Sequence, residues 1–133
     1  MKYLLDTNIC IEMIRQRSVN VVKHCEAHAE EGIGISAITY AELAFGCEKS
    51  SNPAKNRLAL EKFLSPLGVL DFPAAAGPDY ARLRAGLEKH GQIIGPNDLL
   101  IAAHCLHLKS TLVTNNEREF RRVRGLRVIN WMG

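Results

Sequence analysis

The stretch Tyr3-Leu4-Leu5-Asp6-Thr7-Asn8-Ile9 decides the fold that the rest of the sequence must complete. Its apolar residues predict a short buried strand over residues 2–5, and a helix is expected directly afterwards, over residues 8–15. Asp6 therefore stands at the junction of strand and helix. Three more acids occupy comparable places further along the chain, so strand ends that carry carboxylates are the main feature of this sequence.

The remaining sequence alternates between short apolar runs and helical patterns. Further strands are predicted over residues 32–36, 69–72 and 111–114, with an edge strand over 127–130. Helices are expected over residues 19–30, 38–47, 78–90, 99–107 and 117–122, and around the apolar positions Leu60, Phe63, Leu64 and Leu67. This alternation predicts an α/β fold: a central parallel sheet of four to five strands, covered by helices on both faces in three layers. A chain of 133 residues is expected to form one domain, over residues 1–133.

Carboxylates recur where predicted strands give way to helices. Glu42 follows the strand at 32–36, Asp98 opens the helix at 99–107, and Glu119 follows the strand at 111–114. In an open parallel sheet the carboxyl ends of the strands share one edge, so these acids are expected to converge there with Asp6. Converging carboxylates repel one another and persist around a cation, most simply Mg²⁺ or Mn²⁺. The pattern therefore predicts a metal-dependent hydrolase.

Each of these acids also has a local structural explanation. Asp98 suits the first turn of a helix, Asn97 is a good N-cap for the same helix, and Asp6 can cap the helix that follows it. The spacing of Thr39 and Glu42 matches a capping box, in which a glutamate accepts from a backbone amide. Taken singly, most of the acids are explained by capping.

The helix over residues 38–47 argues for more than capping. Ile38, Ala41, Glu42 and Phe45 follow helical spacing and predict an apolar face that contains Glu42. An ionised carboxylate on a buried face needs a partner, and no basic residue stands nearby in the sequence. A cation shared with the other acids supplies that partner.

Charge is distributed unevenly along the chain. Residues 1–66 carry eight basic and eight acidic side chains, whereas residues 67–133 carry nine basic against six acidic. A basic segment beside an acidic metal site suits a phosphodiester substrate. The four cysteines lack a C-x-x-C pair and are expected to be reduced. No secretory signal or membrane span is evident, so a soluble cytoplasmic protein without a membrane partner is expected.

Four motifs in register resemble those of PIN-domain proteins. Residues 4–9 resemble the opening motif of that family and residues 36–43 its second acidic motif. Residues 84–103, with Gly95 and Asp98, resemble the third, and residues 114–120 the fourth. Their order and spacing, over essentially the whole chain, are similar to those of VapC-type toxins of bacterial type II toxin–antitoxin modules. The resemblance implies a three-layer α/β/α PIN-like domain.

The same resemblance implies a Mg²⁺- or Mn²⁺-dependent endoribonuclease. Asp6, Glu42 and Asp98 would be its metal-binding catalytic acids, with Glu119 as a fourth and Asn116 as a further metal ligand. The fourth motif often has Asp at the positions held here by Asn116 and Glu119. A second ion is therefore expected to bind weakly, or only together with substrate.

The resemblance also implies a substrate and partners. Family members cleave cellular RNA, often tRNA, and so inhibit translation. Residues 96–98 and 130–133 look most like enterobacterial-type members, some of which cut initiator tRNA in the anticodon stem-loop. Such toxins usually form homodimers, are neutralised by a small VapB-like antitoxin, and assemble into larger toxin–antitoxin complexes that bind operator DNA through the antitoxin.

Two other readings remain open at the level of the sequence. A phosphatase or a receiver-like phosphoacceptor domain would use an aspartate beside a strand, and Asp71 stands in such a place. A receiver also needs a pair of acids after its first strand and a lysine after its last strand, and this sequence has neither. A non-catalytic RNA-binding module would use the basic second half of the chain and would need no convergence of acids.

Overall fold

Five short strands form a parallel sheet in the computed structural model, which describes residues 1–15 and 18–132. The strands are β1 (Tyr3–Leu5), β2 (Ile33–Ser36), β3 (Gly68–Leu70), β4 (Thr111–Val113) and β5 (Arg127–Ile129). Their order across the sheet is β3-β2-β1-β4-β5, so β1 is central and β5 lies at an edge, as the sequence predicts. The predicted α/β class with a central parallel sheet is confirmed.

The winding of the chain reverses beside β1. From β1 the chain proceeds outward to β2 and β3, and it then returns to add β4 on the other side of β1, with β5 beyond it. In the parallel register Leu4 of β1 lies opposite Gly34 of β2 and Leu112 of β4. The carboxyl ends of β1 and β4 therefore flank the switch point, which is where open α/β sheets bind their ligands.

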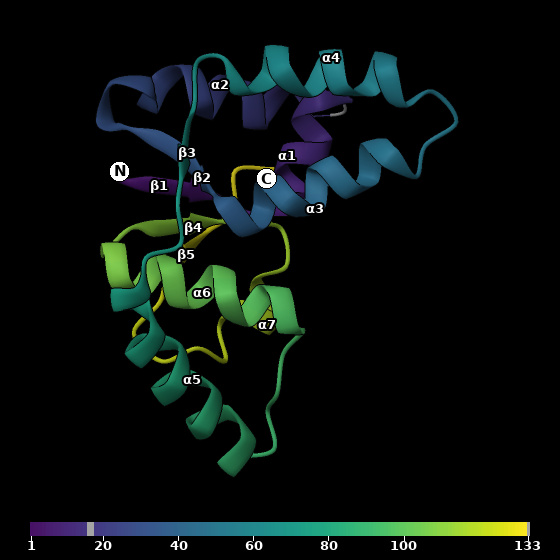
Figure 1. The fold of residues 1–133 in the computed structure, drawn as a ribbon. Coiled ribbons are helices and arrows are strands. Elements are labelled where there is room, and N and C mark those ends of the chain that lie inside the picture. The colour runs from purple at the N-terminus through teal and green to yellow at the C-terminus, as the bar shows by residue number, and fades with distance from the viewer. Residues whose placement is uncertain (16–17, 133) are drawn as a thin grey trace.

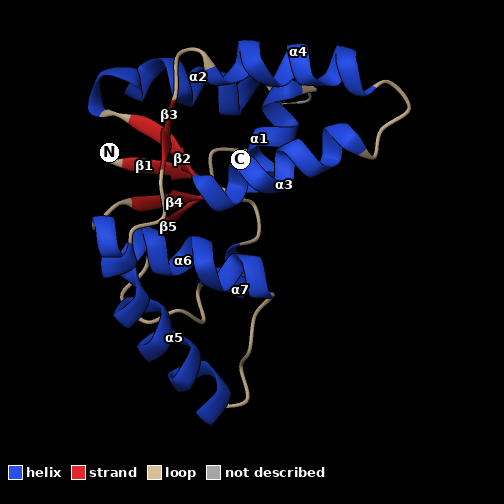
Figure 2. Ribbon diagram, in the orientation of Figure 1, coloured by secondary structure: helices blue, strands red, loops and turns tan. Residues whose placement is uncertain are grey.

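The helices lie in two layers, one on each face of the sheet (Figure 1; Figure 2). One layer holds α1 (Thr7–Ile14), α2 (Val19–His28), the 3₁₀ turn η1 (Ala29–Glu31), α3 (Ala37–Glu48) and α4 (Pro53–Leu64). The other holds the 3₁₀ turn η2 (Ala74–Ala76), α5 (Gly77–Lys89), α6 (Pro96–Leu108) and α7 (Glu117–Phe120). The three-layer arrangement predicted from the alternation of elements is thereby confirmed.

Side chains of the central strand alternate between two hydrophobic cores. Tyr3 and Leu5 pack in the core beneath α1–α4, whereas Leu4 packs in the core beneath α5–α7. This alternation follows from the two-residue repeat of a strand, and burial on both faces explains why β1 is continuously apolar. A polar residue placed at the end of such a strand is held rigidly by both layers.

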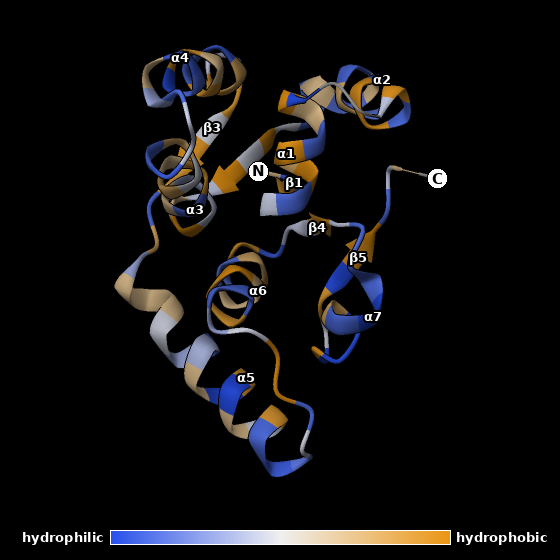
Figure 3. Ribbon diagram, turned by 90° about the vertical axis from the view of Figure 1, so that its right-hand side faces the viewer, coloured by the Kyte–Doolittle hydropathy of each residue, from blue (hydrophilic) through white to orange (hydrophobic). Residues whose placement is uncertain are grey.

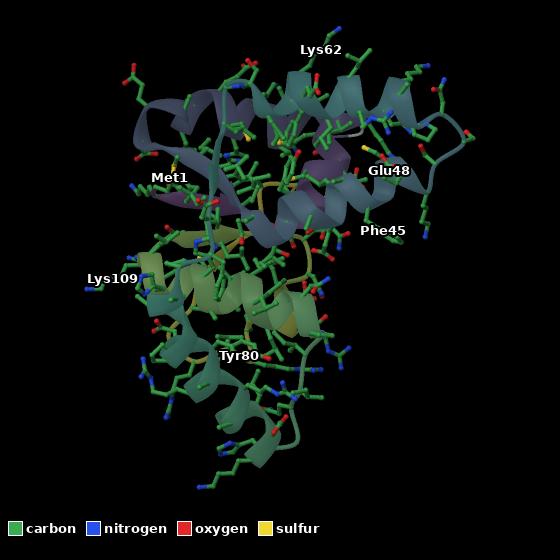
Figure 4. All side chains as sticks on the ribbon, in the orientation of Figure 1. Met1, Phe45, Glu48, Lys62, Tyr80 and Lys109 are labelled. Carbon is green, nitrogen blue, oxygen red and sulfur yellow. The ribbon has the colours of Figure 1, made fainter. Side chains whose placement is uncertain are left out.

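The buried face of α3 differs from the predicted one. Thr39, Leu43 and Cys47 point into the protein, whereas Phe45 is 64% exposed and projects away from the helix (Figure 4). The predicted apolar face through Ile38, Ala41, Glu42 and Phe45 is therefore wrong. Apolar residues occur all around this helix, so periodicity alone does not fix which side faces the sheet.

Two predicted helix caps are also wrong. Helix α6 begins at Pro96, a residue favoured in the first turn, and Gly95 precedes it, so Asn97 lies inside the helix rather than capping it. Helix α3 is capped by Ser36, whose Oγ accepts from the backbone amide of Ile38 at 3.1 Å, and not by a capping box through Glu42. Asn97 and Glu42 are consequently available to each other.

Within the described ranges, no helix is long and apolar enough to cross a membrane. The four cysteines are free, and three of them are buried.

Candidate active site

Asp6 lies at the carboxyl end of β1 and at the start of α1. Its Oδ1 accepts a hydrogen bond from the backbone amide of Ile9 at 2.9 Å, which makes Asp6 the N-cap of the helix, as expected. Its Oδ2 accepts from the hydroxyl of Thr114, the residue that follows β4. Asp6 is only 3% exposed, so the carboxylate sits deep at the switch point of the sheet.

Glu42 reaches the same region from the middle of α3. The hydroxyl of Thr7 donates to its Oε1 at 2.6 Å, and the side-chain amide of Asn97 donates to its Oε2 at 3.3 Å. Glu42 is half-buried at the rim of the site rather than on a buried helix face. Contacts from α1 and α6 nevertheless fix its carboxylate between the two helices that carry Asp6 and Asp98.

Asp98 and Glu119 complete the group from α6 and α7. The two side chains interact with each other, and this interaction raises the pKa of Asp98 and lowers that of Glu119. Glu119 also accepts from the backbone amide of Gly95 at 3.0 Å and from the side-chain amide of Asn116 at 2.7 Å. A Cβ on Gly95 would lie 3.5 Å from Oδ2 of Asp98, so the backbone here runs directly beside the carboxylates.

The four acids, Asp6, Glu42, Asp98 and Glu119, are called the acidic cluster here. Burial raises the pKa of Asp6 from its ordinary value of 3.8 to about 6, and the charge of Glu42 adds to the rise. Burial also raises the pKa of Asp98 to about 6, with further increases from the charges of Glu119, Glu42 and Asp6. Acids from four different elements therefore act on one another electrostatically, as the sequence pattern predicts.

Glu119 behaves differently from the two aspartates. The backbone amide of Gly95 lowers the pKa of Glu119, and the side-chain amide of Asn116 lowers it further. Glu119 therefore stays ionised while Asp98 keeps a proton to higher pH. Perturbed acids whose pKa values are driven apart in one cleft are a common property of functional sites.

The chemistry of the cluster fits a hard divalent cation. All of its ligating atoms are carboxylate oxygens, the type that Mg²⁺ and Mn²⁺ prefer, and no basic side chain contributes to the pKa of either aspartate. Among residues 1–15 and 18–132, however, no three His, Cys, Asp or Glu side chains are already arranged as a metal-binding group. Each carboxylate is instead hydrogen-bonded to its neighbours, so the side chains must turn when they take up an ion.

Sequence reasoning missed the residues that hold the acids in place. Thr7 and Asn97 bind Glu42, Thr114 binds Asp6, and the backbone of Gly95 binds Glu119. The position of Thr114 relative to Asp6 follows from the strand register: Leu5 pairs with Val113, so the residues that come next, Asp6 and Thr114, lie side by side. That relation becomes readable only once β1 and β4 are known to be neighbours.

Asp71 lies away from the acidic cluster. It follows β3, which is an edge strand separated from β1 by β2, and its side chain is exposed. A phosphoacceptor aspartate belongs at the switch point of the sheet, so the receiver-like reading finds no support in this arrangement.

Comparison with known proteins agrees with the geometry. Residues 3–126 match the PIN domain. A ribonuclease VapC2 from Haemophilus influenzae is 42% identical over 132 residues, which cover 99% of each chain. A tRNA(fMet)-specific endonuclease VapC from Shigella flexneri is 40% identical and covers 98% of each chain. The crystal structure of VapBC2 from Rickettsia felis bound to a DNA fragment from their promoter aligns with a TM-score of 0.95 and 43% identity, covering 98% of this chain and 99% of that one.

The chain therefore belongs to the PIN-domain family, whose members are nucleases. Its relatives place it among the VapC-type proteins of that family, and the resemblance and the enzyme class expected from the four motifs are confirmed.

Proposed function

We propose that this protein is the toxin of a toxin–antitoxin pair and acts as a metal-dependent endoribonuclease at the acidic cluster. The observation that carries the proposal is the convergence of Asp6, Glu42, Asp98 and Glu119, in which burial raises the pKa of both aspartates and the charges of neighbouring carboxylates raise it further. A cation that binds among such carboxylates stabilises their ionised forms, because it offsets the repulsion between them. Residues 1–133 act in this proposal as one PIN domain.

The residues of the chain have distinct tasks in this proposal. Asp6, Glu42 and Asp98 hold Mg²⁺ or Mn²⁺, and Glu119 is the fourth acid. When bound, the ion acidifies a water for attack on the phosphodiester and stabilises the charge that develops on the phosphate. Asn116 donates to Glu119 and so orients it, and the oxygen of the same amide remains the predicted further ligand.

Supporting groups keep the acids in their places. Thr114 and the amide of Ile9 restrain Asp6, and Thr7 restrains Glu42. Restraint of this kind matters because a catalytic group displaced by about 1 Å can lose about 10²-fold in rate. Asp98 must lose its proton before it can ligate an ion, so metal binding should strengthen as pH rises through about 6.

We propose tRNA as the substrate, with the anticodon stem-loop of initiator tRNA as the particular target and inhibition of translation as the result. The relative from Shigella flexneri, a tRNA(fMet)-specific endonuclease, supports this choice because its similarity to this chain extends over 131 residues. The basic second half of the chain is consistent with a polyanionic substrate.

The proposed partners follow from the solved relatives. The VapBC structures from Rickettsia felis and Salmonella typhimurium are both DNA-bound toxin–antitoxin complexes. By analogy, a VapB-like antitoxin neutralises this protein and carries the larger complex to operator DNA. A homodimer as the toxin unit is proposed from the resemblance of the four motifs. An arginine from the antitoxin would match the charge of the acidic cluster in place of the ion. The cytoplasm, where its RNA substrates are, is the proposed place of action.

A cleavage assay tests the proposal. The purified protein is incubated with initiator tRNA and with an elongator tRNA, in Mg²⁺, in Mn²⁺ and in chelator, and the product ends are mapped. We expect cleavage of initiator tRNA that requires the metal and is lost in Asp98→Asn. The exposed edge-strand variant Asp71→Asn is the matched control and should cleave like the wild type.

The outcomes separate the parts of the proposal. Cleavage that persists in chelator, or in Asp98→Asn, would reject the acidic cluster as a metal-dependent active site. Cleavage of a different RNA would keep the ribonuclease and reject the substrate. Co-expression of the small protein encoded beside the toxin should suppress cleavage, and unchanged cleavage would reject the antitoxin.

A further inference from the structure

A cavity with basic walls lies between α5 and the segment after α7. Three arginines, Arg82 from α5 and Arg122 and Arg124 from the segment after α7, line this cavity of about 470 Å³. Leu83 and Leu106 are among the apolar residues that also line it. This volume lies within the range of ordinary small-ligand pockets. We call it the arginine cleft.

The arginine cleft has an excess of positive charge, because three arginines and one acidic residue line it. Asp79 is its one acidic lining residue, and both of its carboxylate oxygens are already engaged: Arg82 donates to one at 3.2 Å and His107 contacts the other at 3.2 Å. Arg124 forms no hydrogen bond or ion pair with any residue in the described part of the chain, and it is exposed. Figure 3 shows hydrophilic residues over α7 and over much of α5, the elements around the cleft. An anion is the ligand that such a cleft suits.

The end of the arginine cleft at Gln92 lies near the acidic cluster. Arg122 donates to the backbone carbonyl of Ile93 at 3.1 Å, and it lies three residues after Glu119. The loop that contains Ile93 supplies Gln92 to the cleft and then passes Gly95, whose amide binds Glu119. The two sites are thus connected by one short loop and one turn of chain.

The length of that loop sets how far apart the sites are. Gly95 is three positions after Gln92, and an extended chain spans at most about 3.6 Å per residue, so their Cα atoms lie within roughly 11 Å. A stacked nucleic-acid strand rises roughly 3.4 Å per nucleotide, so about three nucleotides cover the same distance. A strand whose scissile phosphate lies at the carboxylates therefore reaches the Gln92 end of the cleft within a few nucleotides. Arg82 lies ten positions earlier, further along α5, so the strand reaches it several nucleotides later.

We propose that the arginine cleft binds the backbone of the RNA substrate on one side of the cleaved bond. This inference rests on the proposed ribonuclease function and adds a binding site to it. Arg82 and Arg124 pair with phosphates, and the leucines of the cleft offer an apolar surface to a sugar or a base. The contacts carry little base information, so the cleft contributes affinity and register rather than sequence selectivity.

Binding measurements in a cleavage-deficient background test this inference. All proteins carry Asp98→Asn, and their affinity for initiator tRNA is measured in chelator over a series of salt concentrations. The cleft variant is Arg82→Gln with Arg124→Gln. The matched control is Arg57→Gln with Lys62→Gln, two basic residues of α4 on the opposite layer of the protein. Arg82 and Arg124 are both exposed, so the cleft variant should melt at the temperature of the control.

We expect the cleft variant to bind the tRNA at least tenfold more weakly than the control at low salt. The slope of log affinity against log salt should fall by about 1.4–1.8, because each of the two lost phosphate contacts removes roughly 0.7–0.9 from it. Equal affinities and equal slopes for the cleft and control variants would overturn the inference. A cleft that served an acidic protein segment would give unchanged tRNA binding and weaker binding of a polyglutamate peptide, which also overturns it.

These measurements do not depend on cleavage. If the wild-type protein cuts no RNA but the cleft variant loses tRNA affinity, the ribonuclease proposal fails and the cleft remains. If the wild-type protein cuts RNA but the two variants bind alike, the cleft fails and the ribonuclease remains.

Discussion

Replacing Asp6 with asparagine should stabilise the ion-free protein at alkaline pH, even though Asp6 is the most deeply buried member of the acidic cluster. Burial raises its pKa from 3.8 to about 6, and the charge of Glu42 adds to that rise. The difference corresponds to about 3 kcal/mol of cost for the ionised form, at roughly 1.4 kcal/mol per pH unit. Asparagine carries no charge and removes this cost.

The hydrogen bonds of Asp6 survive the substitution. The Oδ1 atom of asparagine can accept from the amide of Ile9, and its amide group can donate to the hydroxyl oxygen of Thr114, which at present donates to Asp6. The bond to Thr114 is weaker once the charge is gone, so the net gain at pH 8 should be about 1–3 kcal/mol.

The sign of the pH dependence is the sharper part of this prediction. The pKa of Asp6 is higher in the folded than in the unfolded protein, so the folded wild type takes up a proton as pH falls through about 6 and becomes more stable. The cost is fully present above about pH 7, falls to about half near pH 5 and is mostly gone at about pH 4. The advantage of Asp6→Asn should shrink in the same way.

Thermal denaturation in chelator at pH 8 and pH 4 measures both quantities. For a chain of this length, roughly 3–5 °C of melting temperature corresponds to 1 kcal/mol, so the gain at pH 8 should be easily resolved. Asp71→Asn, an exposed aspartate at the end of an edge strand, is the control and should change little at either pH. A gain that is equal at both pH values, or a loss of stability at pH 8, would refute the reasoning from buried charge.

Three further outcomes are expected. Mg²⁺ or Mn²⁺ at 100 times its dissociation constant should stabilise the wild type at pH 8 by about 3 kcal/mol, seen as a rise in melting temperature during a titration of the ion. The rise should be clearly smaller for Asp6→Asn. Equal rises in the two proteins would show that Asp6 is not a metal ligand. Asn116→Asp replaces a hydrogen bond donated to Glu119 with a repulsion between two carboxylates, so the free energy of unfolding without the ion should fall by about 1 kcal/mol. Calorimetry should show tighter metal binding by the same variant, and an unchanged metal affinity would contradict a ligand at this position. Ser36→Ala should lower the free energy of unfolding in urea by about 2–3 kcal/mol, because it removes the cap of α3 and leaves Nδ1 of the fully buried His104 without its partner at 2.8 Å. A loss under about 0.5 kcal/mol would show that the bond between Ser36 and His104 contributes nothing.

The architecture was predictable because its signals are local. A buried strand on both faces must be continuously apolar, and β1 and β4 show this directly in the sequence. Helical stripes then alternate with these runs, which requires parallel strands joined by crossover helices. Asp6 and Glu119 could be placed near the sheet edge for the same reason, since each follows a strand closely in sequence, and Asp98 could be placed there because it starts the helix that leads into β4.

The detailed contacts of the site were not predictable because they join elements far apart in the chain. Glu42 was expected on a buried face of α3, but its carboxylate is held at the rim by Thr7 and Asn97, which are 35 and 55 residues away. Asn97 itself was read as a helix cap, since a sequence shows the preference of a residue for a cap but not whether Pro96 has already begun the helix. Strand order, which sets these distances, is a tertiary property.

Capping and metal binding are not alternatives for the same carboxylate. A carboxylate offers about four acceptor positions, and Asp6 uses one for the amide of Ile9 and one for Thr114. The remaining positions are enough to ligate an ion. The bond to Ile9 also lowers the pKa of Asp6 while burial raises it, so the cap keeps a deeply buried acid available for ionisation. An acid that caps a helix can therefore also be a catalytic acid. The helix that Asp6 caps is also the element that holds its carboxylate at the switch point.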